Sequence, residues 1–195
     1  MGKAQRIAAI AAVFSSSLTL ATGAVAAGSG AVGAKVCERE MVAASKAYGI
    51  PLGVLYAVGL TETGRKGSLQ PHAMNIEGRA YYARSRADAV REFHAARASG
   101  AKLIDLGCMQ VNHYYHGEQF ASVAEMLDPG KNVTYAARFL NELKKREGSW
   151  TMAVARYHAG PDNDPAQKRY VCAVIANMVA SGFGAWTPQS RSFCK

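Results

Sequence analysis

The chain has 195 residues, of which 49% are hydrophobic and 19% are charged. This composition excludes a disordered chain, and the length suffices for one domain of about 100–200 residues with its own core. Lysine and arginine number 23 against 14 acidic residues, giving a formal net charge of +9. Such a charge favours an anionic partner, either a cell-wall polymer or membrane headgroups. Nucleic acid is disfavoured, because the sequence contains no dense run of basic residues with interleaved aromatics.

The N-terminal segment has the organisation of a secretory signal peptide. Lys3 and Arg6 precede an apolar run over residues 7–20, and small residues follow at 24–27. We therefore predict a signal peptide over residues 1–27 and export to the periplasm. The apolar run is short and serine-rich for a membrane span, so we expect no integral span, and a retained N-terminal anchor is the alternative.

The predicted export favours disulfide bonds between the four cysteines. Cys37, Cys108, Cys172 and Cys194 have neither CxxC nor metal-ligand spacing, and an oxidising compartment favours two disulfides. Four cysteines allow three pairings. We favour Cys37–Cys194, which would join the ends of the mature chain, together with Cys108–Cys172 in the core. The alternatives are the other pairings and a buried free thiol at Cys108.

The first half of the mature chain predicts helices and then a small β-region. After a glycine- and alanine-rich linker over residues 28–36, the folded domain is expected to span 37–195, with helices at 37–48 and 51–62. The second helix opens on a proline, which suits a first helical position, and a glycine follows its end.

The helical period is lost after the second helix. Residues 75–82 predict a hairpin that turns at Glu77–Gly78, and residues 102–105 predict a third short strand. Between these strands a helix is expected to begin at a capping box formed by Ser85 and Asp88.

The rest of the chain is expected to be helical up to an irregular tail over 182–195. Turn signals separate predicted helices at residues 122–127, 132–147, 150–158 and 165–180. No internal repeat or second domain is visible. We therefore predict a single, mainly α domain of the α+β class with a small β insertion of three strands.

Glu62 is the candidate catalytic acid. Leu55, Gly59 and Glu62 follow an i, i+4, i+7 spacing, which places them on one face of the second helix. A carboxyl at the end of an apolar face, near the negative end of the helix dipole, is expected to have a raised pKa and to donate a proton near neutrality. The alternative is a solvated glutamate at a helix end.

Three further positions carry polar or aromatic groups suited to a sugar ligand. Gln110 and Asn112 follow a flexible glycine, and their amides either bind sugar hydroxyl and N-acetyl groups or satisfy a local turn. Tyr157 and His158 lie where a helix meets a loop, either as a stacking platform for a sugar ring or as helix-end packing. Tyr170 lies on the next helix.

In order and rough spacing, these segments resemble the lytic transglycosylase (SLT) domain. That family's pattern is Glu-Ser, then Gly-Leu-Met-Gln-Ile-Asn, then Ala-Tyr-Asn-Ala-Gly, then a late tyrosine. The matching residues here are Glu62-Thr63-Gly64, Gly107-Cys108-Met109-Gln110-Val111-Asn112, Ala155-Arg156-Tyr157-His158-Ala159-Gly160 and Tyr170-Val171. The resemblance covers about residues 37–180. It implies a lysozyme-like fold and cleavage of the β-1,4 bond between N-acetylmuramic acid and N-acetylglucosamine in peptidoglycan, without a cofactor.

The resemblance also implies roles for single residues. Glu62 would protonate the glycosidic oxygen and then act as base on the muramoyl C6 hydroxyl, giving a 1,6-anhydro product. Met109 would pack beside this acid, and Tyr170 would direct its hydroxyl toward it. The residues expected to bind the glycan are Met109, Gln110, Asn112, Tyr157, His158 and Tyr170.

The chain departs from the family pattern at three positions. Thr63 replaces serine and keeps the hydroxyl, Cys108 replaces leucine and loses apolar volume unless it forms a disulfide, and His158 replaces asparagine. Asp105, just before the second motif, is a second carboxylate. If it activates water, the enzyme is a hydrolytic muramidase like the goose-type lysozymes, and the third hypothesis is a non-catalytic wall-binding scaffold.

Partners and metals complete the sequence-based expectations. The hairpin residues Asn75, Gly78 and Tyr81-Tyr82, together with the pair Tyr157-His158, resemble transglycosylases encoded with conjugation and secretion machinery or in mobile elements. This resemblance implies glycan strands and components of an envelope-spanning machine as partners. The five histidines form no zinc pattern beyond the pair His113/His116, so no metal is expected.

Overall fold

The structure, a computed structural model, describes residues 35–65, 67–160 and 162–195. The predicted signal peptide over 1–27 and residues 28–34 of the predicted linker lie outside the described residues. The helices are α2 (Val36–Tyr48), α3 (Leu52–Thr63), α4 (Arg86–Ala98), α5 (His113–His116), the 3₁₀ turn η1 (Gly117–Gln119), α6 (Val123–Met126), α7 (Pro129–Glu147), α8 (Trp150–His158), α9 (Asp164–Ala180) and α10 (Pro188–Phe193).

The β-region is an antiparallel sheet with the strand order β2-β1-β3-β4. Its strands are β1 (Ala73–Ile76), β2 (Arg79–Tyr82), β3 (Ile104–Leu106) and β4 (Val111–Asn112). The predicted hairpin is confirmed: Glu77 and Gly78 both have positive φ, as a two-residue primed turn requires, and Asn75 Oδ1 accepts the Gly78 N–H. The sheet has one strand more than the three predicted, because Val111 and Asn112 pair with β3.

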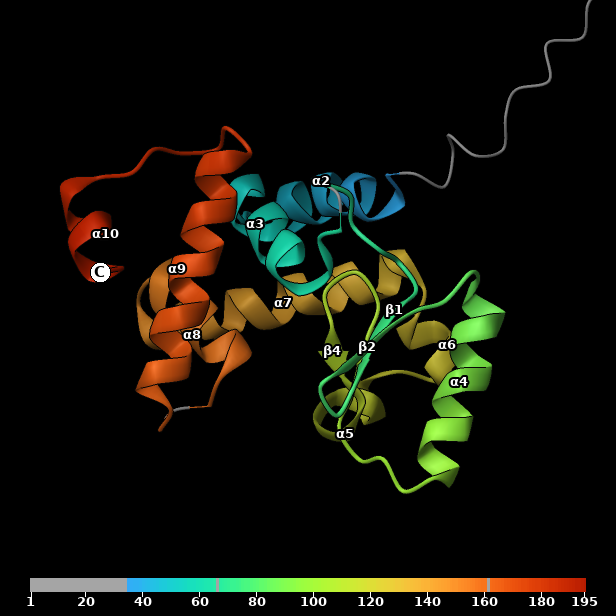
Figure 1. The fold of residues 1–195 in the computed structure, drawn as a ribbon. Helices are drawn as coiled ribbons and strands as arrows, with labels where there is room; N and C mark the ends of the chain where they lie inside the picture. Colours follow the sequence, from blue (N-terminus) through green and yellow to red (C-terminus); the bar gives the residue numbers. More distant parts are fainter. Residues whose placement is uncertain (1–34, 66, 161) are drawn as a thin grey trace, which may run out of the picture.

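Helix α7 crosses the molecule and supports two groups of elements (Figure 1). The sheet lies with α4, α5 and α6 on one side, and α8, α9 and α10 lie on the other. Ala136, Leu140 and Leu143 form a buried apolar stripe on α7, and α2 and α8 pack against this helix. The fold is therefore a mainly helical α+β domain, as the sequence predicts, and the site lies between the two groups.

Local sequence signals explain where most helices begin and end. Ser85 accepts the N–H of Asp88 at the start of α4, while the Asp88 carboxylate accepts the N–H of Arg84 instead of completing the predicted box. The prediction of an irregular tail is wrong over α10. There, Pro188 occupies the first turn and Thr187 caps the helix reciprocally with Ser190.

The predicted disulfide pairing is wrong, although two disulfides are present. The bridges are Cys37–Cys108, which joins α2 to the turn between β3 and β4, and Cys172–Cys194, which joins α9 to the end of α10. Cys37 lies in the core, while α10 is tied to α9 through Cys194 at the far side of the molecule from the start of α2 (Figure 1), so the ends of the domain are not adjacent. Both bridges indicate folding in an oxidising compartment.

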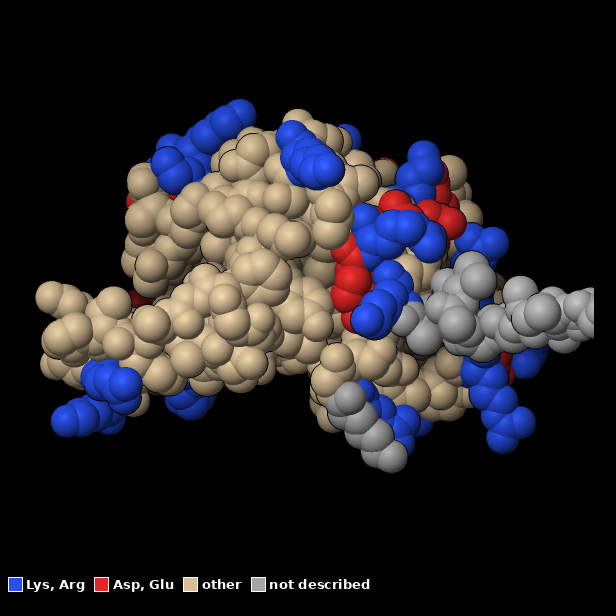
Figure 2. Space-filling model, turned by 90° about the horizontal axis from the view of Figure 1, so that it is seen from above, with Lys and Arg blue, Asp and Glu red and all other residues tan. Residues whose placement is uncertain are grey.

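Charged side chains are unevenly distributed over the surface. Seen from above, lysines and arginines gather with acidic residues on one half of the molecule, and the other half is largely uncharged (Figure 2). Across the part of the chain that the structure describes, no helix combines the length and apolar character needed to cross a bilayer.

The two disulfides are expected to differ in their contribution to stability. Replacing Cys37 and Cys108 together with alanine should lower the free energy of unfolding by about 2–5 kcal/mol, because the bridge closes a long loop and both side chains are fully buried. The C172A/C194A pair, which closes a shorter loop on a peripheral helix, should lose less. Denaturant titration under non-reducing conditions measures both. An equal or larger loss for the second pair would contradict this ranking.

Candidate active site

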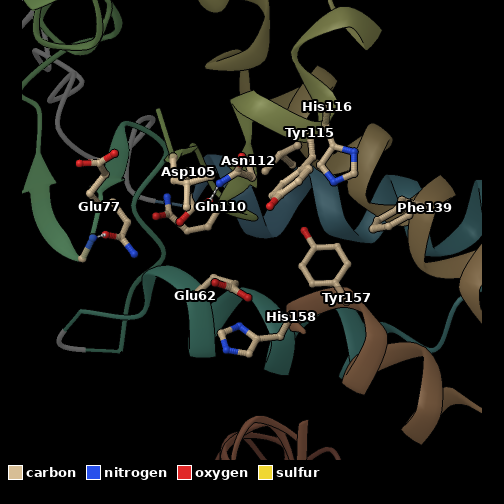
Figure 3. Close-up of a pocket in the computed structure, with 14 residues that line it drawn as sticks. Glu62, Glu77, Asp105, Gln110, Asn112, Tyr115, His116, Phe139, Tyr157 and His158 are labelled. Atoms are coloured by element: carbon tan, nitrogen blue, oxygen red, sulfur yellow. Dashed lines mark hydrogen bonds between the residues drawn. The ribbon is translucent and has the colours of Figure 1, made fainter. Parts of the chain in front are cut away.

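A cleft of about 410 Å³ opens between the sheet and the helices that follow it. The β1–β2 turn, β3 and β4 supply its polar wall, while α5, α7 and α8 supply aromatic side chains, and Glu62 enters from the end of α3 (Figure 3). Tyr157, Gln110, Asn112 and His158 line this cleft. The structure thus brings four segments distant in sequence around one carboxyl group.

Packing fixes α3, and with it Glu62. Leu55 and Gly59 are buried on the face that Glu62 extends, as the spacing predicts. A Cβ at Gly59 would collide with Met41 of α2, so glycine allows the two helices to approach closely. Next to Glu62, Thr61 Oγ1 accepts a hydrogen bond from Asn177 Nδ2 of α9 at 2.9 Å. The carboxyl is therefore carried by a helix held from two sides.

The Glu62 carboxyl is a weak acid in this environment. Burial raises its pKa to about 8, the hydrogen bond from Tyr170 lowers it, and the negative charge of Asp105 raises it again. Because the burial effect is the largest, the carboxyl is mostly protonated at neutral pH. It lines the cleft and can therefore donate its proton to a bound ligand.

Tyr170 lies behind Glu62 and contacts it directly. Its hydroxyl donates to Glu62 Oε1 at 2.5 Å, from a ring that is only 5% exposed. Burial and the neighbouring carboxyl raise the pKa of the phenol well above its ordinary value, so Tyr170 remains a donor. The hydroxyl points at the acid, where the family resemblance expects it.

Met109 has a different position from the one expected of a sugar-binding residue. Its side chain is fully buried and is not part of the cleft lining. Its backbone does support the site: the carbonyl accepts the Tyr157 hydroxyl at 2.7 Å, and the N–H donates to Asn132 Oδ1 at 2.9 Å. Met109 is thus a supporting residue behind Tyr157.

The amides of Gln110 and Asn112 reach the cleft but are also bound to the protein. Gln110 Nε2 donates to the carbonyls of Ala73 and Gly107. Asn112 Nδ2 donates to Asp105 Oδ1 at 2.6 Å, while its oxygen caps α5. Gln110 and Asn112 therefore line the cleft and also form hydrogen bonds within the local turn.

Asp105 is the second carboxyl of the cleft. It stands opposite Asn112 in the β3–β4 ladder, and both residues line the cavity. Burial raises its pKa, and the hydrogen bond from Asn112 partly opposes this increase. Its orientation is therefore set by the sheet.

Several lining residues were not predicted as ligand-binding residues, namely Glu77, Tyr115, His116 and Phe139. The aromatic run that follows Asn112 was an available signal for Tyr115 and His116. Phe139 lies on a long helix and gives no local signal. His116 shares a 2.8 Å hydrogen bond with Tyr135, and in the described residues no group of three or more metal-ligating side chains is assembled.

Fold and site together define a mainly helical α+β domain that presents one desolvated, protonated carboxyl in an open cleft. Comparison with protein families matches residues 40–174 to the transglycosylase SLT domain, more than half of the chain. The protein therefore belongs to the SLT transglycosylase domain family. Membership in this family implies lytic transglycosylase activity on peptidoglycan. Comparisons with curated proteins and with solved structures give no match.

The raised pKa of Glu62 predicts a pH-dependent stability difference. A group whose pKa rises from 4.5 to about 8 on folding contributes stability that is fully present below 4.5 and is lost as the pH rises through 8. Because glutamine cannot ionise, the Tm of E62Q relative to wild type should increase by a few degrees between pH 5 and pH 9. Thermal unfolding at both pH values measures this.

The exposed Glu142 on α7 provides the matched control. The Tm difference between E142Q and wild type should stay nearly flat over the same pH interval. A flat difference for E62Q as well would show that Glu62 is not desolvated.

Proposed function

We propose that this protein is a peptidoglycan lytic transglycosylase that cleaves the β-1,4 bond between N-acetylmuramic acid and N-acetylglucosamine and forms a 1,6-anhydro-muramoyl end. The observation that carries the proposal is the Glu62 carboxyl, protonated near neutrality, lining the cleft and held by the Tyr170 hydroxyl.

In the proposed reaction Glu62 acts first as acid and then as base. It protonates the glycosidic oxygen while the bond to muramoyl C1 breaks, so N-acetylglucosamine leaves as an alcohol. The resulting carboxylate then accepts the proton of the muramoyl C6 hydroxyl as that oxygen attacks C1. A pKa of about 8 suits both steps, because the acid is loaded at neutral pH and its conjugate base is stronger than an ordinary carboxylate.

The proposal needs no second carboxylate. Retaining and inverting glycosidases generally use two carboxylates. The second acts as nucleophile in retaining enzymes and activates water in inverting enzymes. Here the N-acetyl group of the substrate can stabilise the oxocarbenium-like carbon, and the attacking hydroxyl belongs to the same sugar.

The lining of the cleft fits a sugar strand. Tyr115, Phe139 and Tyr157 supply aromatic rings, and Gln110 and Asn112 supply polar groups beside them (Figure 3). Pyranose rings likewise have apolar faces and polar edges. The net positive charge of the chain further fits an anionic wall polymer.

We also propose that the enzyme acts in the periplasm in local wall remodelling. The two disulfides and the leader pattern of residues 1–27 support export. Association with a secretion or conjugation machine is proposed only from the resemblance of the hairpin residues Asn75, Gly78 and Tyr81-Tyr82 and of the pair Tyr157-His158.

Digestion of purified sacculi by wild type beside E62Q tests the assigned acid. Wild type should release fragments with 1,6-anhydro ends, identified by mass spectrometry, with a rate that falls above pH 8 as Glu62 ionises. E62Q should release at least about 100-fold less, because removal of a general acid typically costs 10²–10⁴-fold. Wall lysis retained by E62Q would show that the acid is another residue.

Asp105 gives the hydrolytic alternative a specific observation, since it lines the same cleft as Glu62. D105N should keep the 1,6-anhydro product and lose no more than about tenfold in rate, because Asp105 acts on the acid only through its charge. A muramidase would instead yield ends heavier by one water in wild type and lose them in D105N. Wild type that binds sacculi without releasing any fragment would support the scaffold hypothesis.

A further inference from the structure

His158 stacks on the tyrosine that holds the acid. The rings of His158 and Tyr170 are parallel within 4°, with centroids 4.2 Å apart, and the Tyr170 hydroxyl donates to Glu62. We propose that His158 is a positioning residue, whose ring holds the Tyr170 phenol in line with the Glu62 carboxyl. This inference rests on the proposed function, because it concerns the same acid.

A short path through the chain fixes the two rings relative to each other. Helix α8 ends at His158, and the carbonyl of Gly160 just beyond it accepts a 2.6 Å hydrogen bond from Gln167 Nε2. Gln167 precedes Tyr170 by three residues on α9, so the two side chains lie on the same face of that helix. One face of α9 thus anchors the chain after His158 and presents the ring on which His158 stacks.

The phenol needs such support because a hydrogen bond alone does not fix the plane of the ring. The hydrogen bond to Glu62 constrains the position of the Tyr170 oxygen, whereas stacking constrains rotation of the ring about its own axis and its tilt. The carboxyl itself is held by α3, which is tied to α9 through Thr61 and Asn177. Three helices therefore contribute one group each: Glu62 from α3, His158 from α8 and Tyr170 from α9.

The environment of His158 favours a neutral ring. Burial lowers the pKa of the imidazole, and the positive charge of Arg169 on α9 lowers it further. The ring also lines the cleft near Glu62 (Figure 3), so its role must be separated from substrate contact. Asparagine, which the SLT pattern has at this position, presents no ring face, so this stack distinguishes the present chain from that pattern.

The proposed positioning role depends on the size and planarity of the His158 ring. Three variants separate this role from substrate contact. H158F keeps a planar ring without titratable nitrogens and should retain at least half of the wild-type kcat and the same alkaline limb of the pH profile. H158A and H158N lose the stack and should lower kcat about tenfold with little change in KM. The assay is the release of 1,6-anhydro ends from sacculi by the full chain.

A double-mutant cycle with Y170F tests whether His158 acts through Tyr170. If it does, adding H158A to Y170F should reduce kcat by less than twofold beyond Y170F alone. Independent effects that multiply would overturn the proposal, as would an H158F variant that is as impaired as H158A, because both would assign the ring to substrate contact or solvent exclusion.

Two further variants keep the outcomes distinguishable. His94, exposed on α4, offers a control, and H94A should leave kcat and KM unchanged. Unchanged kcat in H158A would overturn the positioning role while leaving the proposed function intact. Full activity of E62Q would instead overturn the proposed function itself.

Discussion

The chemistry of this protein depends on the balance between burial of the Glu62 carboxyl and its hydrogen bond with Tyr170. Desolvation disfavours the carboxylate, and the phenol favours it, but burial is the stronger effect and leaves a pKa of about 8. Had the cleft been open behind Glu62, water would have restored an ordinary acid that is ionised at neutral pH. The packing of α3 against α9 is therefore an electrostatic requirement as well as a structural one.

The turn that carries Gln110 toward the cleft is supported from behind by a buried amide and a glycine. Asn132 of α7 is fully buried, accepts the N–H of Met109, and donates to the carbonyls of Leu106 and Met126. A Cβ on Gly107 would come within 2.7 Å of Asn132 Nδ2, so glycine is required where the amide meets the turn. Beside Glu62, the Thr63 hydroxyl donates to the carbonyl of Cys108. The hydroxyl shared by serine and threonine at this position thus ties the acid's helix to the turn.

Structural elements whose determinants are local could be predicted from the sequence. Capping residues, prolines and glycines identify most helix ends, and the Glu77–Gly78 turn identifies the hairpin. Features that depend on which segments lie close together in space could not be predicted. The pairing Cys37–Cys108 and the strand β4 exist because α2 and β3 lie beside the same turn, which no local pattern encodes. In the site, motif order placed Glu62 and Tyr170 together, whereas Phe139 reaches the cleft only through the packing of α7.

The second carboxyl of the cleft helps to keep the first one protonated. Asp105 and Asn112 stand opposite each other in the β3–β4 ladder, and the amide holds the carboxylate oxygen at 2.6 Å, so strand pairing fixes its direction. This hydrogen bond engages Oδ1, one of the two oxygens of the carboxylate. The negative charge of Asp105 nevertheless raises the pKa of Glu62. An aspartate placed in this way adds its charge to the effect of burial, and both favour the protonated form of Glu62.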